Sequence, residues 1–509
     1  PNGTISDNAP IQYQGLDRFD ARRKIVEDLD AAGLLVKVED HKLMVPRGEK
    51  SGVVVEPLLS DQWFVQVGPL AEPAIKAVEN GDITFNPKQA ENIYFAWMRD
   101  LKDWCISRQQ WWGHRIPAWY NEAGEVFVGK SEASVRARHQ LGDEIRLRQD
   151  DDVLDTWFSS ALWTFSTLGW PEDTEALKTF HSTDLMVTGH DIISFWVSRM
   201  IMMTLKFMDE VPFKEVYIHG LVTDAEGQKM SKSKGNGLDP MDIIDGITAQ
   251  ALITKRCENL LQARQQEKIE RATRKEYPDG IAAYGTDALR FTFCAIATSA
   301  RAMRFDLKRV EGYRNFCNKL WNAANYVLMS TDERIQSTTP VESVADQWIR
   351  LKFQETNNAV NQAMDDYRFD LAAKHIYEFV WDEFCDWYLE LCKPVLLSDT
   401  ASSAEKAGTQ TCLLETLEAT LRLAHPFMPF ITEELWQKLP QPLRGGPSLM
   451  LAAYPAPASI PDTRDGIFAD IQWIKEVVGA VRNIRGEQDI PPNKLIPILL
   501  QQGSPSDRS

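Results

Sequence analysis

The sequence predicts a layered α/β region over residues 56–300, followed by an α-helical bundle. In the first region, short β-like runs such as 83–85 and 216–218 alternate with helical runs such as 194–208. This alternation is typical of a sheet covered by helices, because a strand buries its apolar face against another layer. From about residue 305 onward, apolar residues recur at helical spacing almost throughout, which predicts the bundle.

The first 55 residues predict one helix and no core of their own. Apolar residues within 19–29 suit one helix face, and Gly33 suits its end. In the α/β region, residues 216–222 predict a buried strand that runs into a glycine-containing loop. Residues 255–280 are rich in Lys, Arg, Glu and Gln, which predicts an exposed helical insertion.

The helical region is interrupted at few places. Apolar residues of 320–328 and of 379–391 follow helical spacing, and prolines break the pattern at 426–429. The stretch 397–408 is rich in Ser and Ala, and 439–462 is rich in Pro. Both stretches are predicted to be loops or linkers.

Charge and cysteine content exclude several classes of protein. The net charge of −17 argues against a generally basic nucleic-acid coat protein. It leaves a nucleic-acid partner open, because phosphate binding needs only a local basic face. The seven cysteines are scattered without a C-x-x-C pair, which predicts reduced thiols in a cytoplasmic protein and no structural zinc. The most apolar stretch, 192–208, contains Arg199 and Lys206, so we expect no membrane span and no membrane partner.

Residues 229–236, Lys-Met-Ser-Lys-Ser-Lys-Gly-Asn, form the most informative stretch of the chain. Three lysines concentrate positive charge, the hydroxyls add donors, and Gly227 and Gly235 permit close approach and movement. Such a loop suits a polyphosphate whose charge rises in a transition state. Composition alone favours a solvated basic surface loop. However, the stretch follows the predicted strand 216–222 and a turn at 224–227, and this context favours phosphate binding.

This stretch resembles the Lys-Met-Ser-Lys-Ser signature of class I aminoacyl-tRNA synthetases, in which a mobile loop grips the phosphates of ATP. The resemblance implies that 56–300 is the C-terminal half of a Rossmann-like catalytic domain. It assigns Lys229 and Lys232 to catalysis, as stabilisers of the pentavalent phosphoryl centre and the departing pyrophosphate. ATP is the implied cosubstrate, with Mg²⁺ expected beside it. The implied ATP-binding residues are His219, Gly220, Leu221, Lys229, Met230, Ser231, Lys232 and Ser233.

Three further stretches resemble the branched-chain members of that family. They are 103–117, the aromatic stretch 152–160, and 189–196, which is similar to a pocket segment of the valine-specific branch. Ile192 and Trp196 lie four residues apart, so on an α-helix their side chains would share a face. The alternatives are an isoleucine-specific pocket and a plain set of core residues. The implied valine-binding residues are Trp157, Asp191, Ile192 and Trp196.

A basic stretch separates the two predicted domains. Residues 301–319 hold six Lys or Arg against two acidic residues on a strongly acidic chain, which predicts a surface facing tRNA. Residues 346–480 resemble the helical anticodon-binding domain of the family. Arginines beside Trp residues in 103–117 suit nucleotide or acceptor-end contacts. The predicted tRNA-binding residues are Arg108, Arg115, Arg304, Lys308, Arg309, Arg314 and Lys319.

The second signature of the family, His-Ile-Gly-His, does not occur in the sequence. In the family it lies at a helix N-terminus that meets ATP. The implied reaction is the ATP-dependent activation of valine to valyl-adenylate and its transfer to tRNA(Val). We expect a monomeric partial enzyme that alone neither activates valine nor proofreads, the alternative being a non-catalytic tRNA-binding fragment. The expected parts are an editing-insertion tail (1–55), the catalytic half (56–300), a stem-contact linker (301–345), the anticodon-binding domain (346–480) and the start of a C-terminal extension (481–509).

Overall fold

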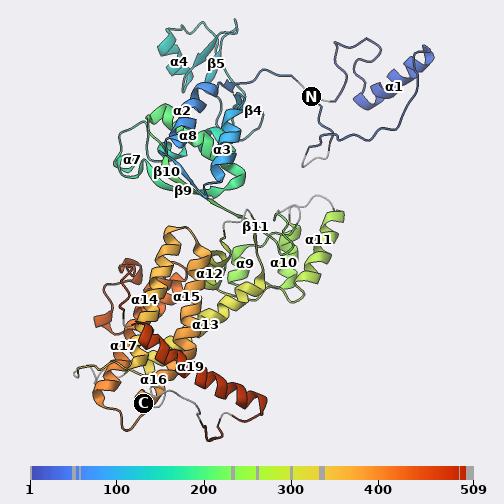
Figure 1. Ribbon diagram of the computed structural model, residues 1–509. Helices are drawn as coiled ribbons and strands as arrows, with labels where there is room; N and C mark the ends of the chain where they lie inside the picture. Colours follow the sequence, from blue (N-terminus) through green and yellow to red (C-terminus); the bar gives the residue numbers. More distant parts are fainter. Residues whose placement is uncertain are drawn as a thin grey trace. The chain divides into compact units, whose positions relative to one another are not determined.

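The structure is a computed structural model that divides into two compact units, Pro1–Trp63 and Phe64–Ser509. Figure 1 shows the secondary-structure elements of both units. Some segments are not described. The described residues are 3–48, 53–56, 59–230, 235–258, 263–298, 302–331, 339–462, 464–491 and 493–499.

The first unit holds one helix, α1 (Arg18–Ala31). The carboxylate of Asp17 caps this helix by accepting a hydrogen bond from the Phe19 amide at 2.8 Å. Gly33 follows the helix with a left-handed φ of +69°. Among the described residues of this unit, Ala21 alone is buried. The prediction of one helix without a core is therefore confirmed.

A parallel sheet is the centre of the α/β region. Its strands, in spatial order, are β2 (Thr84–Asn86), β10 (Phe213–His219) and β9 (Thr183–Gly189). The helices that pack around it are α2 (Gly68–Glu79), α3 (Ala90–Arg99) and α8 (Ser198–Met208), as Figure 1 shows. Phe85, Tyr94, Ile201 and Val216 from strands and helices share one buried core. The three strands are parallel, so their carboxyl ends lie at the same edge of the sheet.

Shorter strands and helices surround this sheet in sequence. The antiparallel pairs are β1 (Phe64–Val65) with β3 (Trp104–Cys105), β4 (Ser107–Arg108) with β8 (Val153–Leu154), and β5 (Ala118–Tyr120) with β6 (Val126–Val128) and β7 (Arg148–Gln149). The helices are α4 (Glu132–His139), α5 (Thr156–Ala161), α6 (Trp163–Ser166) and α7 (Glu175–Phe180). Because β8 leads directly into α5, the β4–β8 pair fixes where α5 begins.

The predicted strand over 216–222 is interrupted at Gly220. β10 ends at His219, where its partner β9 also ends at Gly189. The next strand, β11 (Leu221–Thr223), pairs in parallel with β12 (Ala302–Arg304) in a different sheet. The predicted strand therefore runs into a glycine-containing loop, as expected. A second short strand follows in another sheet, because a strand extends only as far as a neighbour offers hydrogen-bond partners.

The chain after the lysine loop forms α9 (Pro240–Ile244), α10 (Ala249–Cys257), α11 (Ala263–Glu276) and α12 (Thr286–Ile296). Backbone hydrogen bonds of 2.9 and 2.8 Å between Ile247 and Ile281 close the base of the α10–α11 pair. The helical insertion predicted at 255–280 is therefore confirmed as helical, although it begins earlier, at Ala249.

The helical region contains α13 (Leu307–Met329), α14 (Val344–Asp365), α15 (Phe369–Glu378), a π-helix (Phe379–Tyr388), α16 (Leu389–Leu396), α17 (Ser403–Ala424), α18 (Pro429–Trp436) and α19 (Arg464–Glu487). Phe291 of α12 and Phe316 of α13 are fully buried in the same core as Trp348, Phe384 and Trp436. The bundle core therefore extends back through α13 to α12. Among the described residues, no helix is long and apolar enough to cross a bilayer.

Two stretches of the helical region were expected to be loops. The prediction for 397–408 is wrong from Ser403 onward, because a capping box starts α17 there. Ser402 Oγ accepts from the Glu405 amide at 3.2 Å, and Glu405 Oε2 accepts from the Ser402 amide at 2.8 Å. The prediction for 439–462 is confirmed, since its helical turns are the short Gln441–Leu443 and Leu449–Leu451.

Candidate active site

The candidate site begins where β9 and β10 end together. His219 is the register partner of Gly189, so the two chains leave the sheet at the same edge. A Cβ added to Gly189 would lie 2.8 Å from Asp191 Oδ1, 3.5 Å from the Leu221 side chain and 3.6 Å from His219 Cε1. The side chains of three predicted site residues thus surround the space that a side chain at Gly189 would fill. In open parallel sheets, ligands bind outside the carboxyl ends of the strands.

The first lysine of the lysine loop reaches this edge. A bridge between Thr223 and Lys229 turns the chain back after β11. Lys229 Nζ then lies 3.7 Å from Asp191 Oδ2, with side chains 70% and 39% exposed. Such an exposed pair contributes about 0–1 kcal/mol, so the ammonium group stays available to a ligand. Met230 packs on a core that includes Val222, which anchors the start of the loop.

Part of the predicted phosphate grip lies outside the described residues. Ser231, Lys232 and Ser233 fall in the undescribed stretch 231–234. The predicted roles of Lys232 and of the two serines therefore stay predictions. His219 and Gly220 are described, and His219 Nδ1 lies 2.9 Å from Gly220 O.

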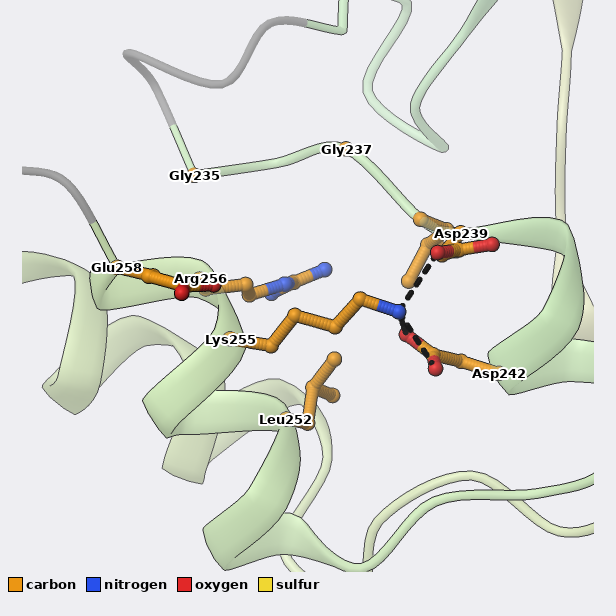
Figure 2. Close-up of a pocket in the computed structure, with 9 residues that line it drawn as sticks. Gly235, Gly237, Asp239, Asp242, Leu252, Lys255, Arg256 and Glu258 are labelled. Atoms are coloured by element: carbon orange, nitrogen blue, oxygen red, sulfur yellow. Dashed lines mark hydrogen bonds and ion pairs between the residues drawn. The ribbon is translucent and has the colours of Figure 1, made fainter.

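The C-terminal side of the lysine loop is supported by the α10–α11 insertion. A Cβ on Gly235 would lie 2.7 Å from the side chain of Ile269 on α11, so only a glycine fits this contact. Figure 2 shows Lys255 of α10 reaching Asp239 and Asp242, at 2.6 Å and at 2.9 and 3.0 Å. The hydrogen bond from Lys255 lowers the pKa of Asp239, and the two carboxylates raise the pKa of Lys255. A cavity of about 440 Å³ lies between these side chains and the chain segment that holds Gly235 and Gly237.

The predicted valine-binding residues lie on two adjoining segments. Trp157 belongs to α5, whereas Ile192 ends a 3₁₀ turn (His190–Ile192) and Trp196 lies in a π-helix (Ile193–Val197). The Trp157 and Phe195 rings stack with centroids 5.8 Å apart. Trp196 Nε1 donates to Ser160 O at 3.0 Å, which joins the π-helix to α5. The structure therefore brings the two segments together.

The local helix geometry differs from the prediction. Spacing of four residues places Ile192 and Trp196 on one face only if both belong to one α-helix. The α-helix α8 instead begins at Ser198, after the 3₁₀ turn and the π-helix. The predicted helical run 194–208 is confirmed, although its first turn is a π-helix and not an α-helix. π-Helical turns inside longer helices occur frequently at functional sites, because the extra residue redirects side chains.

A buried carboxylate directly before α5 anchors this helix, and it was not among the predicted site residues. Asp155 is 5% exposed and directly precedes α5. Its Oδ2 accepts from Trp104 Nε1 at 2.9 Å and lies 3.2 Å from Arg108 Nη2 and 3.8 Å from Arg199 Nη1. Arg199 also lies over the Trp104 ring at 4.0 Å. Burial lowers the pKa of Arg199 to about 10, while Asp155 raises it and Arg108 lowers it further. A buried Arg inside an apolar run was the available signal for this cluster.

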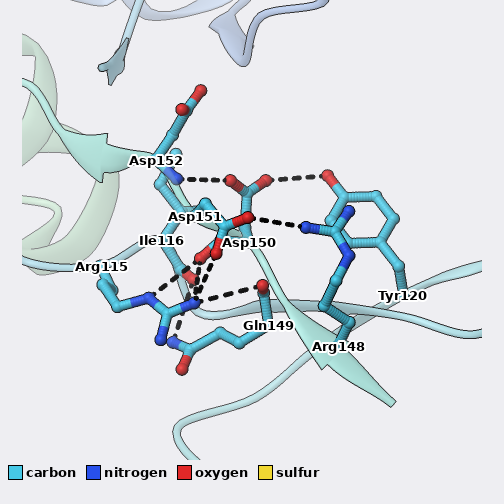
Figure 3. A network of polar contacts seen from close by, with 8 residues as sticks. All are labelled: Arg115, Ile116, Tyr120, Arg148, Gln149, Asp150, Asp151 and Asp152. Carbon is cyan, nitrogen blue, oxygen red and sulfur yellow. Dashed lines mark hydrogen bonds and ion pairs between the residues drawn. The ribbon is translucent and has the colours of Figure 1, made fainter. Parts of the chain in front are cut away.

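Two predicted tRNA ligands, Arg108 and Arg115, make contacts within the protein. Arg108 pairs with Asp155 and donates to Cys105 O at 3.0 Å and to Ser107 O at 2.8 Å. Figure 3 shows Arg115 donating to Gln149 O at 3.2 Å and to Asp150 O at 2.8 and 3.0 Å. These bonds tie the chain before β5 to the end of β7. Their predicted contact with tRNA stays a prediction.

The other five predicted tRNA ligands lie on β12 and α13. Four of them are exposed, and the fifth, Lys319, is half-buried. The exposed residues are Arg304, Lys308, Arg309 and Arg314. Lys319 Nζ instead bonds Asp386 Oδ1 at 2.6 Å and lies 3.7 Å from the centroid of the Trp381 ring, which joins α13 to the π-helix of the bundle.

Metal-ligating side chains do not gather in the part of the chain that the structure describes. There, no group of three or more His, Cys, Asp or Glu side chains is placed to hold a metal ion. All seven cysteines are free thiols.

The family model described as tRNA synthetases class I (I, L, M and V) matches residues 8–306, and the one described as anticodon-binding domain of tRNA ligase matches residues 346–500. A Mycobacterium tuberculosis methionyl-tRNA synthetase in complex with methionyl-adenylate aligns with a TM-score of 0.53 over 77% of this chain and 65% of that one, at 18% identity. This likeness shows a shared fold.

The chain therefore belongs to the class I tRNA synthetases of the I, L, M and V group. Its similar relatives are valine–tRNA ligases. That of Legionella pneumophila (strain Paris) is 56% identical over 507 residues, which cover 99% of this chain and 55% of the relative. That of Acinetobacter baylyi is 54% identical over 98% of this chain and 53% of the relative. The chain thus spans about half the length of the curated relatives that it matches. The expected fold, a Rossmann-like α/β region followed by a helical anticodon-binding domain, is confirmed.

Proposed function

We propose that this chain forms the lysine-loop half of a valine–tRNA ligase, which activates valine with ATP and transfers it to tRNA(Val). The observation that carries the proposal is the approach of Lys229 Nζ to Asp191 Oδ2 at 3.7 Å. The ammonium of Lys229, for which we propose phosphate binding, lies beside the segment that holds Ile192 and Trp196. Identity of 56% to the Legionella pneumophila valine–tRNA ligase supports valine as the amino acid.

The proposed activation step needs no nucleophilic side chain. The carboxylate oxygen of valine attacks the α-phosphorus of ATP, and the bond to the bridging oxygen breaks as pyrophosphate leaves. Negative charge on the phosphoryl oxygens rises during this exchange, and the ammonium of Lys229 stabilises it electrostatically. Lys232 is proposed to share this task. Catalysis is then positioning and charge stabilisation.

Magnesium fits this proposal only as a companion of ATP. The described residues offer no cluster of three metal ligands, and the Asp191 carboxylate lies 3.7 Å from Lys229 Nζ. Mg²⁺ usually keeps several waters and takes phosphate oxygens with one or two carboxylates. Asp191 would be such a carboxylate, and the ion would neutralise phosphate charge.

Contact with tRNA is proposed for the exposed cations of β12 and α13. Arg304, Lys308, Arg309 and Arg314 are exposed on an acidic chain, so they form a local basic surface suited to a phosphate backbone. The anticodon would meet the helical domain. A cytoplasmic, monomeric protein also belongs to this proposal, and seven free thiols are compatible with a reducing compartment.

A hybrid enzyme tests the proposal. In it, this chain replaces the matching 507-residue segment of the Legionella pneumophila valine–tRNA ligase. We expect valine-dependent exchange of pyrophosphate into ATP by the hybrid and none by the 509-residue chain alone. A folded hybrid without valine-dependent exchange would contradict the proposed activity, and clear exchange by the chain alone would contradict the proposed division into halves.

A non-catalytic tRNA-binding role is the second candidate. The absence of a His-Ile-Gly-His string favours it, since that signature contacts ATP in the family. Filter binding of tRNA to the 509-residue chain separates the two roles when it is read beside the exchange assay. Retention of tRNA combined with an inactive hybrid would support the binding role.

A further inference from the structure

Asp224 occupies the point at which the lysine loop leaves β11. It opens a tight turn in which the Gly227 amide donates to Asp224 O at 2.9 Å and the Asp224 amide donates to Gln228 O at 3.0 Å. Gly227 adopts a left-handed φ of +81°, which a glycine accepts without strain. The turn places the Asp224 carboxylate beside the first residues of the loop.

That carboxylate contacts both ends of the loop. Asp224 Oδ1 accepts from the Gln228 amide at 2.6 Å, immediately before Lys229. Asp224 Oδ2 accepts from Asn236 Nδ2 at 2.9 Å, on the returning chain. Asn236 Nδ2 also lies 3.3 Å from Lys229 O. One side chain therefore joins the outgoing and returning segments of the chain at the base of the loop.

We propose that Asp224 is a positioning residue whose carboxylate closes the base of the lysine loop and fixes where Lys229 lies relative to Asp191. Hydrogen bonds to an ionised acceptor are stronger than neutral ones, so a carboxylate suits a contact that has to hold an exposed turn in place. Gly235 fits against Ile269 only because it has no Cβ, and this contact supports the returning segment of the loop. The catalytic consequence rests on the proposed function, whereas the closure itself does not.

A charge swap distinguishes this contact from general stability. Asn236→Asp sets two carboxylates against each other and opens the base. Asp224→Asn together with Asn236→Asp restores a donor opposite an acceptor, because the new amide at 224 donates to the new carboxylate at 236. The control is Glu226→Gln, which removes one negative charge from the exposed side of the same turn.

Amide hydrogen exchange over 227–236 in the 509-residue chain measures the closure directly, without any substrate. Loss of a hydrogen bond to a charged group should speed exchange about tenfold in Asn236→Asp. The double variant should return to within about threefold of the starting protein, and Glu226→Gln should not change it. Equal exchange in Asn236→Asp and Glu226→Gln, or no recovery in the double variant, would overturn the proposal.

Exchange kinetics in the hybrid enzyme test the catalytic consequence. Misplacement of a catalytic group by about 1 Å can cost about 100-fold. We expect Asn236→Asp to lower kcat for valine-dependent pyrophosphate exchange by about 10- to 100-fold, with KM for valine unchanged and with recovery in the double variant. A change confined to KM would overturn positioning of Lys229. An inactive starting hybrid would instead refute the proposed function, and hydrogen exchange would still decide whether the base is closed by Asp224.

Discussion

Two buried carboxylates, Asp155 in the α/β region and Asp346 in the helical region, are held in different ways. Asp155 Oδ2 has one neutral donor, Trp104 Nε1 at 2.9 Å, and two guanidinium groups at 3.2 and 3.8 Å. Asp346 accepts from neutral donors only at short range, namely the Ser343 amide and hydroxyl at 2.8 Å each, Tyr388 at 2.6 Å and Thr409 at 3.0 Å. The first carboxylate therefore faces two cations at longer range, and the second is closely bonded by uncharged donors.

The difference indicates where the chain is organised for stability and where for binding. Near the proposed valine-binding residues, Arg199 Nη1 is buried without a hydrogen-bond partner, which is costly for a charged group. In the bundle, Asp346 of α14 contacts Tyr388 of the π-helix and Thr409 of α17, so its carboxylate joins three helices. Its contacts with Ser343 instead close the capping box of α14 itself. Functional sites commonly break the rules of polar satisfaction that the rest of a protein obeys. We therefore expect a substitution at Asp155 to affect the proposed site and a substitution at Asp346 to affect stability.

The largest expected effect falls on the α/β side. Lys229→Ala should lower valine-dependent pyrophosphate exchange by the hybrid enzyme by about 100- to 1,000-fold, the usual cost of removing one charge-stabilising donor. Stability should not change, since the side chain is 70% exposed. Lys214→Ala is the matched control, because Lys214 is 66% exposed and pairs with Asp184 at 2.8 Å at the opposite end of β10. Equal losses in both variants would contradict a specific role for Lys229.

The next effect falls on the helical side. Asp346→Ala removes a capping box and leaves buried donors without an acceptor, so we expect a loss of about 3 kcal/mol in the free energy of unfolding. Urea denaturation of the 509-residue chain measures it. Glu405→Ala is the control, since Glu405 closes the exposed capping box of α17 and should cost far less. Similar losses would remove the contrast between the buried and the exposed carboxylate.

The outline of the fold followed from periodicity, but parts of the site did not. Helical spacing in 320–328 and 379–391 predicted the bundle, because apolar faces repeat within each helix. The cluster around Asp155 has no such local pattern, since Asp155 and Trp104 are 51 residues apart in sequence. The π-helix at Ile193–Val197 was also hidden, because one extra residue per turn barely disturbs an apolar run.

The meeting of Lys229 and Asp191 was implied by family resemblance and not by spacing. Lys229 follows β11 and Asp191 follows β9, which belong to two different sheets, and the tertiary fold brings the two side chains together. The pairing of β11 with β12 likewise depends on a partner about 80 residues away in sequence. Contacts set by tertiary pairing cannot be derived from the local sequence.

A smaller effect tests the charged cluster itself. Asp155→Asn keeps the shape but leaves Arg108 and Arg199 without a counter-charge, so we expect a loss of about 1–2 kcal/mol in stability. In the hybrid enzyme, KM for valine should rise, because α5 with Trp157 begins immediately after Asp155. Melting curves and exchange kinetics measure the two quantities. A stability loss without any change in KM would show that the cluster serves only the fold.

The smallest effect is a pH dependence within the bundle. Burial lowers the pKa of His425 below its ordinary value, although Glu433 and Asp287 oppose this shift. The unfolded state, with a pKa of about 6.5, therefore binds more protons just below that pH, and stability rises with pH until it levels off above about 6.5. Urea midpoints at pH 5.5 and 7.5 should differ less in His425→Asn than in the starting protein. An identical pH dependence in the variant would refute the assignment.

The most direct test of the central claim is the amino-acid dependence of pyrophosphate exchange by the hybrid enzyme. The claim is that Lys229 grips ATP beside a pocket of Trp157, Ile192 and Trp196 that is shaped for valine. An extra methylene in a filled pocket costs about 1–3 kcal/mol, so exchange with valine should be at least about tenfold faster than with isoleucine at equal concentration. Equal or faster exchange with isoleucine would contradict the claim.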